Sequence, residues 1–202
     1  MKAPLLVELQ VEELPPKSLQ TLGDAFATLL AAALVAEGLA AADAAVAAFA
    51  TPRRLAVRVA GVLAQAPDRP LRHKLMPVGV GLDGEGRPTP ALVRKLDSLG
   101  LDAGVVPALR RVAEGRNEVL VLETVRAGAT LAAGLDSALA EALARLPIPK
   151  VMSYQLDDGW SSVHFVRPAH RLVALHGATV VPVSVLGLRA GRTTHGHRFE
   201  AA

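Results

Sequence analysis

The apolar positions at the start of the chain change from a continuous run to a helical spacing. The run Leu5–Leu9 consists of β-compatible residues, and Pro15 and Pro16 must end whatever element it forms, so we expect a strand there. From Ser18 to Glu37 apolar residues recur three and four positions apart. This spacing predicts an amphipathic helix over about 18–37, with a buried stripe formed by Leu19, Leu22, Phe26, Leu29, Leu30, Ala33 and Leu34.

Shorter patterns fill the middle of the chain. The residues Leu55, Val57 and Val59 alternate with Ala56, Arg58 and Ala60, which predicts a strand that turns Arg58 toward water. A short helix is expected over 90–99 because a glycine follows its last turn. The apolar runs 109–113 and 118–125 are separated by a Gly-containing turn, so we expect them to pair as a hairpin.

The last third of the chain combines a second helix with β-branched runs. Leucine recurs at helical spacing from Thr130 until Pro147, which predicts a second main amphipathic helix over about 130–146. The runs 163–166, 172–176 and 179–188 have the composition of antiparallel strands. Because helices and strands come in unequal blocks and not in a regular β-α-β alternation, the pattern predicts an α+β fold with mixed or antiparallel sheets.

One segment has the composition of a connection between these elements. Residues 67–89 contain four prolines and four glycines and lack a clear period of either kind. We therefore expect an extended connection there. The chain would then consist of two subdomains, 1–66 and 90–202, joined by the segment 67–89.

The composition is that of a globular protein. Hydrophobic residues make up 51% of the 202 residues and charged residues 20%, and there is no cysteine. Disulfides and thiolate metal sites are therefore excluded. No uninterrupted apolar run reaches the roughly 18–20 residues that a bilayer span requires. We expect a cytoplasmic protein with no membrane partner.

The sequence offers no recognisable catalytic or ligand-binding motif. The spaced glycines of 79–86 are bracketed by Pro77 and Pro88, whereas a dinucleotide loop needs a strand before it and a helix after it. His195 and His197 flank one glycine but lack the further ligands of a zinc site. A nucleophile elbow is missing as well. We expect no catalytic residue, metal or cofactor on this chain.

Charge leaves one class of ligand open. The chain carries 22 basic and 19 acidic residues, and the basic ones are mostly arginine, whose planar fork matches phosphate oxygens. Aromatic residues make up only 3% of the chain, so any RNA would be held through its backbone and shape more than by base stacking. The basic clusters are Arg53, Arg54 and Arg58; Arg69, Arg72 and Lys74; Arg110 and Arg111; and Arg189, Arg192, His195, His197 and Arg198.

The neighbouring acids Glu12 and Glu13 are a weaker candidate for chemistry. Adjacent residues of a strand point to opposite faces, so the two carboxylates would not share a substrate. We expect one of them to pair with an arginine or to cap the helix that begins near Ser18.

Five segments carry a resemblance to a known family. They are VELQVEELPPKSL near the start, TPRRLA at 51–56, LPIPK at 146–150, FVRPAH at 165–170 and GHRF at 196–199. In this order and spacing they resemble the amino-terminal part of the β subunit of the two-subunit bacterial glycyl-tRNA synthetase. That subunit is several times longer and includes an HD-like and an anticodon-binding domain, so the resemblance implies an amino-terminal fragment.

Four positions depart from the family pattern. Gln10 and Val11 stand where the family usually has Gly-Thr. Arg171 stands where an aromatic residue is common, and His195 where an arginine is usual. The order of the five segments is unaffected.

The resemblance implies a role within a larger enzyme. The family's α2β2 enzyme joins glycine to tRNA(Gly) using ATP, and its adenylate-forming site, with ATP and Mg, belongs to the separate α subunit. This region would support tRNA binding, assembly with the α subunit, or both. Within the matched segments the expected contact residues are Arg53, Arg54, Lys150, Arg167 and Arg198.

Each of these residues has an alternative role as an ion pair or helix-terminus contact that holds the fold. Two other functions also stay open. One is a hydrolase that edits mischarged tRNA, with His170 or His197 as the residues to test. The other is a purely structural domain whose only partner is the rest of the synthetase.

Overall fold

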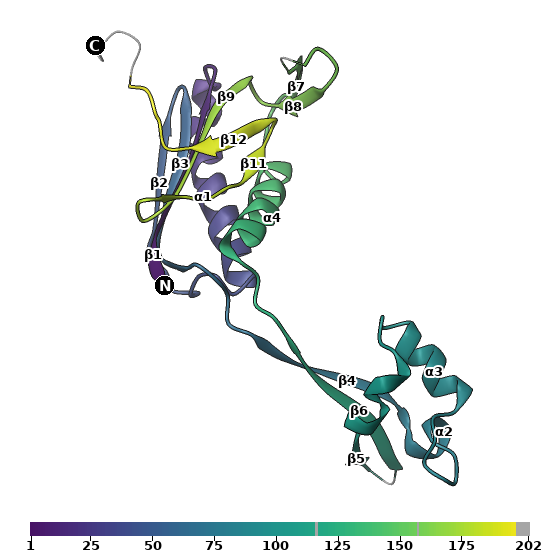
Figure 1. Cartoon of the computed structure of the whole chain (residues 1–202). Helices are drawn as coiled ribbons and strands as arrows, with labels where there is room; N and C mark the ends of the chain where they lie inside the picture. Colours follow the sequence, from purple (N-terminus) through teal and green to yellow (C-terminus); the bar gives the residue numbers. More distant parts are fainter. Residues whose placement is uncertain (116, 157, 197–202) are drawn as a thin grey trace. The chain divides into compact units, whose positions relative to one another are not determined.

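The computed structural model describes residues 1–115, 117–156 and 158–196, and the chain divides into two compact units (Figure 1). Unit 1 is formed by Met1–Pro67 together with the chain from Gly128 onward. Unit 2 is formed by Asp68–Ala127 and is inserted between these two parts. Each unit has its own apolar core.

The main feature of unit 1 is a mixed seven-stranded sheet with the order β11-β12-β9-β1-β3-β2, in which β10 also pairs with β9. Neighbouring strands run antiparallel except for β12 and β9, which are parallel. The strands are β1 (Lys2–Val11), β2 (Val46–Thr51), β3 (Arg54–Leu63), β9 (Ala169–His176), β10 (Thr179–Val180), β11 (Ser184–Val185) and β12 (Leu188–Gly191).

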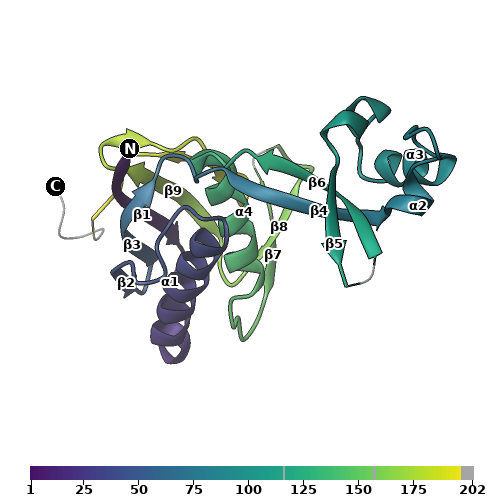
Figure 2. The same ribbon diagram turned by 90° about the horizontal axis from the view of Figure 1, so that it is seen from below.

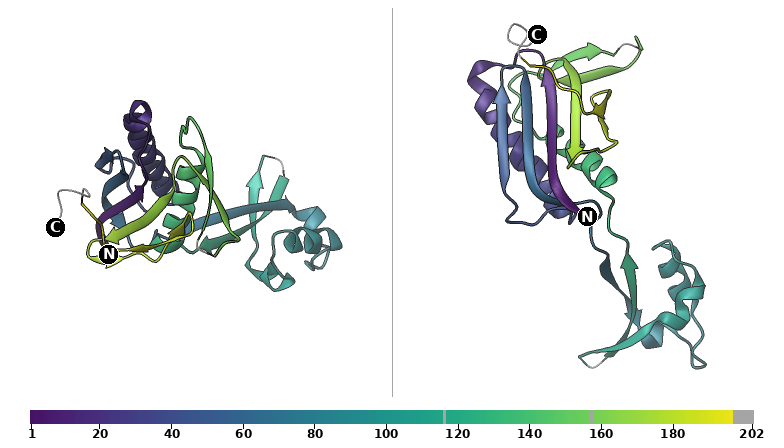
Figure 3. Two further views of the ribbon diagram at one scale, coloured as in Figure 1. Left: turned by 90° about the horizontal axis from the view of Figure 1, so that it is seen from above. Right: turned by 60° about the vertical axis from the view of Figure 1, so that its left-hand side comes forward.

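Two helices, α1 (Leu19–Ala36) and α4 (Leu131–Ala144), cover one face of this sheet (Figure 3). A short 3-10 helix, Pro16–Ser18, leads into α1. The core lies between the helices and the alternate residues of the strands that face them. Its fully buried members include Leu5, Val7, Leu55, Val57, Leu172, Leu22, Phe26, Leu30, Leu135 and Leu139.

Both predicted helices are confirmed, and their buried residues have the expected spacing. In α1 the side chains of Leu22, Phe26, Leu30 and Leu34 are inaccessible to solvent. The stretch Pro16–Ala36 is long and apolar enough to cross a membrane by composition. Its packing against the sheet explains that composition, because the same side chains form the protein core.

Helix α4 begins at a side-chain cap. The Thr130 hydroxyl accepts a hydrogen bond from the Ala133 amide at 3.3 Å, which is the usual satisfaction of a free amide at a helix start. Gly134 then lies so close to Leu39 that a β-carbon at this position would overlap the Leu39 side chain. At its other face α4 holds β11, since Asp136 accepts a hydrogen bond from the Ser184 amide at 3.1 Å.

A separate hairpin completes unit 1 (Figure 2). It consists of β7 (Met152–Gln155) and β8 (Ser162–Phe165), which pair with each other in a two-stranded sheet. The strand β8 is the predicted run near 163–166, but β7 was not predicted. Its residues Met-Ser-Tyr-Gln show no β-branched enrichment, and only their pairing with β8 makes them a strand.

Unit 2 is a three-stranded sheet with the order β4-β6-β5 and helices packed on one side. Its strands are β4 (Arg69–Pro77), β5 (Arg110–Glu114) and β6 (Asn117–Arg126), and its helices are α2 (Val78–Gly81), α3 (Pro90–Asp97) and the 3-10 helix Ala103–Ala108. The fully buried centre of this small core consists of Leu92, Leu96 and Leu120. The predicted short helix and hairpin are both present.

The predicted connection 67–89 is wrong as a description of this segment, because it supplies β4 and α2. β4 lies at the edge of its sheet, where Pro70 and Pro77 can be accommodated without a lost ladder bond on the outer side. The units accordingly divide at 67/68 and 127/128, and not at the boundaries 1–66 and 90–202. Residues 69–77 form a strand because they pair with β6, which is distant in the sequence. The local sequence pattern gives no sign of this pairing.

The predicted strand 179–188 is also corrected. It is broken into β10, β11 and the start of β12. Pro182 cannot donate to a ladder, and Leu186 and Gly187 both have positive φ values, 54° and 78°. The chain therefore turns twice where a continuous strand was expected.

Candidate functional site

The second face of the unit 1 sheet, which we call the outer face, carries most of the polar side chains of its strands. Strand register places Gln10 of β1 beside Arg54 of β3 and Arg171 of β9. The next row along the sheet contains Glu8, Ala56, Val173 and, from β2, Phe49. The third row contains Leu6, Arg58 and Leu175.

Segments far apart in the sequence meet at the end of β1, which we call the β1 corner. The β2–β3 turn lies against it, because the carbonyl oxygens of Pro52 and Arg53 accept hydrogen bonds from the Leu14 and Val11 amides at 2.6 and 3.0 Å. From the other side the Pro168 carbonyl accepts from the Glu12 amide at 2.9 Å. Three of the five segments that carry the family resemblance thus converge here.

The centre of the corner is a half-buried ion pair. Glu8 is the one charged residue among those described that is buried, with 7% of its surface exposed. Its carboxylate lies 3.3 Å from Arg54 Nε and accepts a hydrogen bond from the Thr194 hydroxyl. Arg54 Nη2 donates to Thr194 Oγ1 at 3.2 Å and to the His195 carbonyl at 2.5 Å. Arg54 therefore ties the segment 192–196 to the sheet.

Gln10 strengthens the same attachment. Its side-chain amide donates to Thr194 Oγ1 at 3.0 Å and to the His195 carbonyl at 3.1 Å. Two side chains of neighbouring strands, Gln10 and Arg54, thus hold one backbone carbonyl. A glycine at position 10 would make none of these contacts.

A second cluster of the corner is built on a β-bulge. The pairing of β1 with β9 shifts between Gln10 and Val11, so His170 is the extra residue that the bulge redirects. His170 Nε2 lies 2.9 Å from Glu12 Oε1, and Arg53 Nη2 lies 2.7 Å from Glu12 Oε2. Glu12 therefore pairs with an arginine, as the sequence predicted for one of the two acids.

The contacts of Glu12 make its ionised form favourable. The hydrogen bond from His170 and then the charge of Arg53 hold the pKa of this carboxyl below its ordinary value of 4.5. A carboxyl group with a lowered folded-state pKa stabilises the fold above its unfolded pKa, and that stabilisation is lost as the pH falls through the folded value.

We expect the Glu12→Gln variant to lose less stability than the wild type when the pH is lowered from neutral to below 4.5. The amide keeps the shape of the side chain and cannot titrate. The measurement is urea unfolding across this pH range, and other carboxyl groups cancel because both proteins share them. Parallel pH profiles of the two proteins would contradict the assignment.

The five expected contact residues lie in different surroundings. Arg53 and Arg54 take part in the ion pairs of the corner, which is the geometry of their alternative, fold-holding role. Arg167 Nε donates to the Glu13 carbonyl at 2.8 Å, so it too binds its own chain. Lys150 is exposed and has no ion-pair partner among the described residues. Arg198 lies outside the described residues, as does His197.

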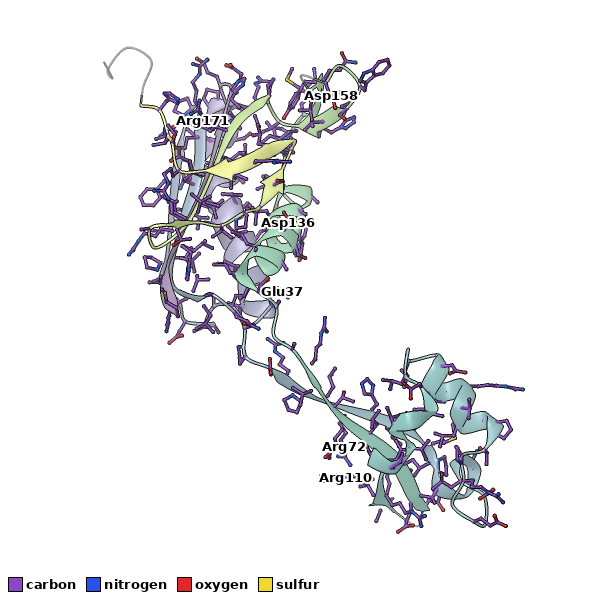
Figure 4. The ribbon with its side chains drawn as sticks, in the orientation of Figure 1. Glu37, Arg72, Arg110, Asp136, Asp158 and Arg171 are labelled. Carbon is purple, nitrogen blue, oxygen red and sulfur yellow. The ribbon has the colours of Figure 1, made fainter. Side chains whose placement is uncertain are left out.

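Other arginines of the outer face are free of such pairing. Arg58 is exposed, and Arg171, which is labelled in Figure 4, is half-buried. Within the described part of the chain no carboxylate pairs with either one. Alternation along β12, in which Ala190 is the neighbour of the inward-facing Leu172, places Arg189 on the outer face as well. The sequence indicated the polarity of Arg58, but the grouping of all three needs the sheet register.

The basic residues of unit 2 are partly neutralised. Lys74 pairs with Glu114, and Arg110 pairs with Glu123 at 3.3 Å. The first pair joins the two outer strands, β4 and β5, across the middle strand β6. The second pair joins β5 to β6. Unit 2 therefore offers a weaker phosphate site than the number of its basic residues indicated.

The described residues form few arrangements that could bind a metal or catalyse a reaction. No three His, Asp or Glu side chains within 1–115, 117–156 and 158–196 come together as metal ligands. The carboxylate–histidine pair of Glu12 and His170 lies at an open surface, with 41% and 54% of the two side chains exposed. A hollow of about 340 Å³ lies elsewhere, between α1 and β2, and is lined mainly by alanine and valine.

Comparison with known proteins gives one consistent result. The family described as "Glycyl-tRNA synthetase beta subunit" matches residues 5–202. Proteins described as the glycine–tRNA ligase beta subunit are similar over 98% of the chain: that of Leptothrix cholodnii is 66% identical, that of Acidovorax sp. 63% and that of Dechloromonas aromatica 62%. The chain spans about 28% of the length of these relatives.

Proposed function

Because the chain belongs to the glycyl-tRNA synthetase β subunit family, we propose that it is a non-catalytic part of a glycine–tRNA ligase that contacts tRNA phosphates through the outer face of its sheet. The ligase would attach glycine to tRNA(Gly) using ATP in the cytoplasm. Its adenylate-forming site, with ATP and Mg, would belong to the α subunit of an α2β2 assembly. This part of the β subunit would bind the tRNA and the α subunit.

The observation that carries the phosphate contact is the contrast between paired and unpaired arginines. Arg53 and Arg54 are committed to Glu12 and Glu8, whereas Arg58, Arg171 and Arg189 project from three strands of one face without a carboxylate partner in the described chain. An arginine without a carboxylate partner can bind a phosphate without first breaking an ion pair within the chain. Such contacts give affinity and orientation but no sequence readout.

The contact residues expected from the family segments remain part of this proposal. Lys150 is exposed, and Arg198 lies outside the described residues. Arg53, Arg54 and Arg167 would act on tRNA or on the α subunit through the surface that they shape, since their charged groups already bind the chain itself.

We expect the double variant Arg58→Ala, Arg171→Ala to bind tRNA with a salt slope that is smaller by about 2, since each lost phosphate contact lowers the slope by about 1. Binding should weaken about equally for all tRNAs. The measurement is the dissociation constant at a series of salt concentrations. The Arg145→Ala variant is the control, because Arg145 is an exposed arginine of unit 1 that pairs with Glu141 on the helix side.

An unchanged slope in the double variant would remove the outer face from the proposal. The variant Arg53→Ala, Arg54→Ala should be measured with an unfolding curve beside it. A loss of binding that follows a loss of stability indicates the fold-holding role, while a loss of binding in a stable variant indicates direct contact.

The pair of Glu12 and His170 favours a second candidate function, hydrolytic editing of mischarged tRNA. A carboxylate that orients a histidine is the usual arrangement of a general base. Deacylation of a mischarged tRNA by the chain, abolished in His170→Ala, would support this function. Absence of that activity in the wild type leaves the pair as a structural contact of the corner.

A further inference from the structure

The hairpin of β7 and β8 presents a single tryptophan to solvent. Trp160 is the only tryptophan of the chain, and 91% of its surface is exposed. It lies in the connection between the two strands, at the end of the hairpin that carries Asp158 (Figure 4). Large aromatic side chains are normally buried, so a tryptophan exposed to this extent needs an explanation.

Hydrogen bonds join the described residues of the connection that carries Trp160, which are 156 and 158–161. The Asp158 carboxylate accepts from the Trp160 amide at 2.9 Å, from the Ser161 amide at 2.8 Å and from the Ser161 hydroxyl at 2.6 Å. Gly159 has a φ of 72°, a conformation that favours glycine. The Leu156 amide closes the turn by donating to the Ser161 carbonyl at 2.8 Å.

The hairpin is attached to the rest of unit 1 close to this turn. Leu156 packs so closely on Gly187 that a β-carbon at position 187 would overlap it. The Tyr154 hydroxyl accepts a hydrogen bond from the Ala169 amide at 3.1 Å. The backbone on either side of Trp160 is therefore attached to the rest of unit 1, which reduces the backbone entropy lost when a partner covers the ring.

Charge distinguishes between the partners that a tryptophan can serve. The residues 156–162 include two aspartates and no lysine or arginine. The hydrogen bonds from Ser161 and Trp160 lower the pKa of Asp158, so that this carboxyl is ionised at neutral pH. A nucleic acid would bring phosphates toward this negative charge, whereas a protein pocket bordered by basic side chains complements it.

We propose that Trp160 is the anchor of a protein interface and that it inserts into an apolar pocket bordered by lysine or arginine on the α subunit of the ligase. Tryptophan is enriched among the residues that dominate binding energy, and those residues lie in desolvated pockets. The inference rests on the proposed assembly role but not on the phosphate contact of the outer face. Each can fail while the other holds.

The test uses the chain labelled with 5-fluorotryptophan, which gives one fluorine signal because there is one tryptophan. Adding unlabelled, purified α subunit should shift this signal and remove its sensitivity to exchange of water for D2O. The Trp160→Ala variant should bind the α subunit at least tenfold more weakly, as expected for an interface anchor. Asp158→Ala should weaken binding less, since it loosens the turn and keeps the ring.

The matched control is Phe49→Ala, which removes the other strongly exposed aromatic side chain among the described residues of unit 1, 51% exposed on β2, and should leave α-subunit affinity unchanged. The proposal is overturned if the chain does not bind the α subunit, if it binds without a change of the fluorine signal, or if Trp160→Ala binds as tightly as the wild type. A signal that responds to tRNA alone, or to the concentration of the chain alone, assigns Trp160 to base stacking or to self-association and overturns it as well.

Discussion

Replacing Gly128 with alanine is expected to destabilise unit 1 by about 4 kcal/mol, above the usual range for overpacking because the obstacle is backbone. A β-carbon at this position would overlap the carbonyl oxygen of Ala66, and Pro67 lies close by. Neither group can move aside as a flexible side chain would. The two chain segments must therefore separate.

Their separation would break several contacts together. The Ala66 amide donates to the Ala129 carbonyl at 2.9 Å, and the Leu131 amide donates to the Ala64 carbonyl at 2.9 Å. These bonds fix the start of α4 beside the end of β3. Urea unfolding of the variant measures the effect, and the matched control is Gly191→Ala, where a β-carbon meets open space. Equal unfolding midpoints for the two variants would show that the chain relaxes around the added methyl group.

Replacing Glu8 with alanine is expected to cost about 3 kcal/mol of unfolding free energy. Removing one partner of a buried, hydrogen-bonded ion pair leaves the other charge uncompensated, and such changes cost about 3–5 kcal/mol when both groups are buried. Arg54 keeps 27% of its side chain exposed, so the lower end applies. The buried Nε of Arg54 has no hydrogen-bond partner among the described residues and would lose its one nearby charge.

The same variant should loosen the segment 192–196. Thr194 would lose its contact with the Glu8 carboxylate, and Arg54 would lose the charge that orients it. Faster hydrogen exchange of the amides in this segment, with unchanged exchange in α1, is the expected result. Glu13→Ala is the control, because Glu13 is 77% exposed and lies 4.0 Å from Arg53. Equal stability of the two variants would show that the Glu8 pair contributes no more than a surface pair.

The elements that the sequence predicted well are those whose buried residues are close in the chain. Helices α1 and α4 needed only their own spacing and the Thr130 cap. Strand β4 could not be predicted, since its prolines and polar residues form a strand only through pairing with β6, about 50 residues later. Strand β7 was missed for a different reason, because its residues lack β-branched enrichment and become a strand only by pairing with the neighbouring β8. Local patterns do not contain long-range pairing.

The candidate site shows the same division. The sequence predicted that one of Glu12 and Glu13 pairs with an arginine, and Glu12 pairs with Arg53. The pairing of Arg54 with Glu8 was not predicted. The sequence could not indicate which arginines remain free, because that depends on where each opposing carboxylate lies. Arg171 and Arg189 become neighbours of Arg58 on one face only through the order β12-β9-β1-β3.

The four positions that were expected to differ from the family pattern lie close together in the structure. Gln10 is the register partner of Arg171, and its side chain binds the His195 carbonyl. Three of the four unusual positions are therefore neighbours at the β1 corner. The fourth, Val11, is buried next to them with 3% exposure. Gln10 is the member of this group whose side chain attaches the segment 192–196.

The way unit 2 is inserted has a consequence for how unit 1 can form. Pairing of β3 with the chain before α4 requires closing a loop of about 60 residues, and the entropy of closure rises with the length of an open loop. Unit 2 has its own apolar core, and its first and last strand residues, Arg69 and Arg126, are register partners. Once folded, it holds the two chain ends beside each other. For the folding of unit 1, the insertion then acts like a short turn. The entropy lost on bringing the end of β3 to the start of α4 is that of closing a hairpin and not that of closing a long open loop.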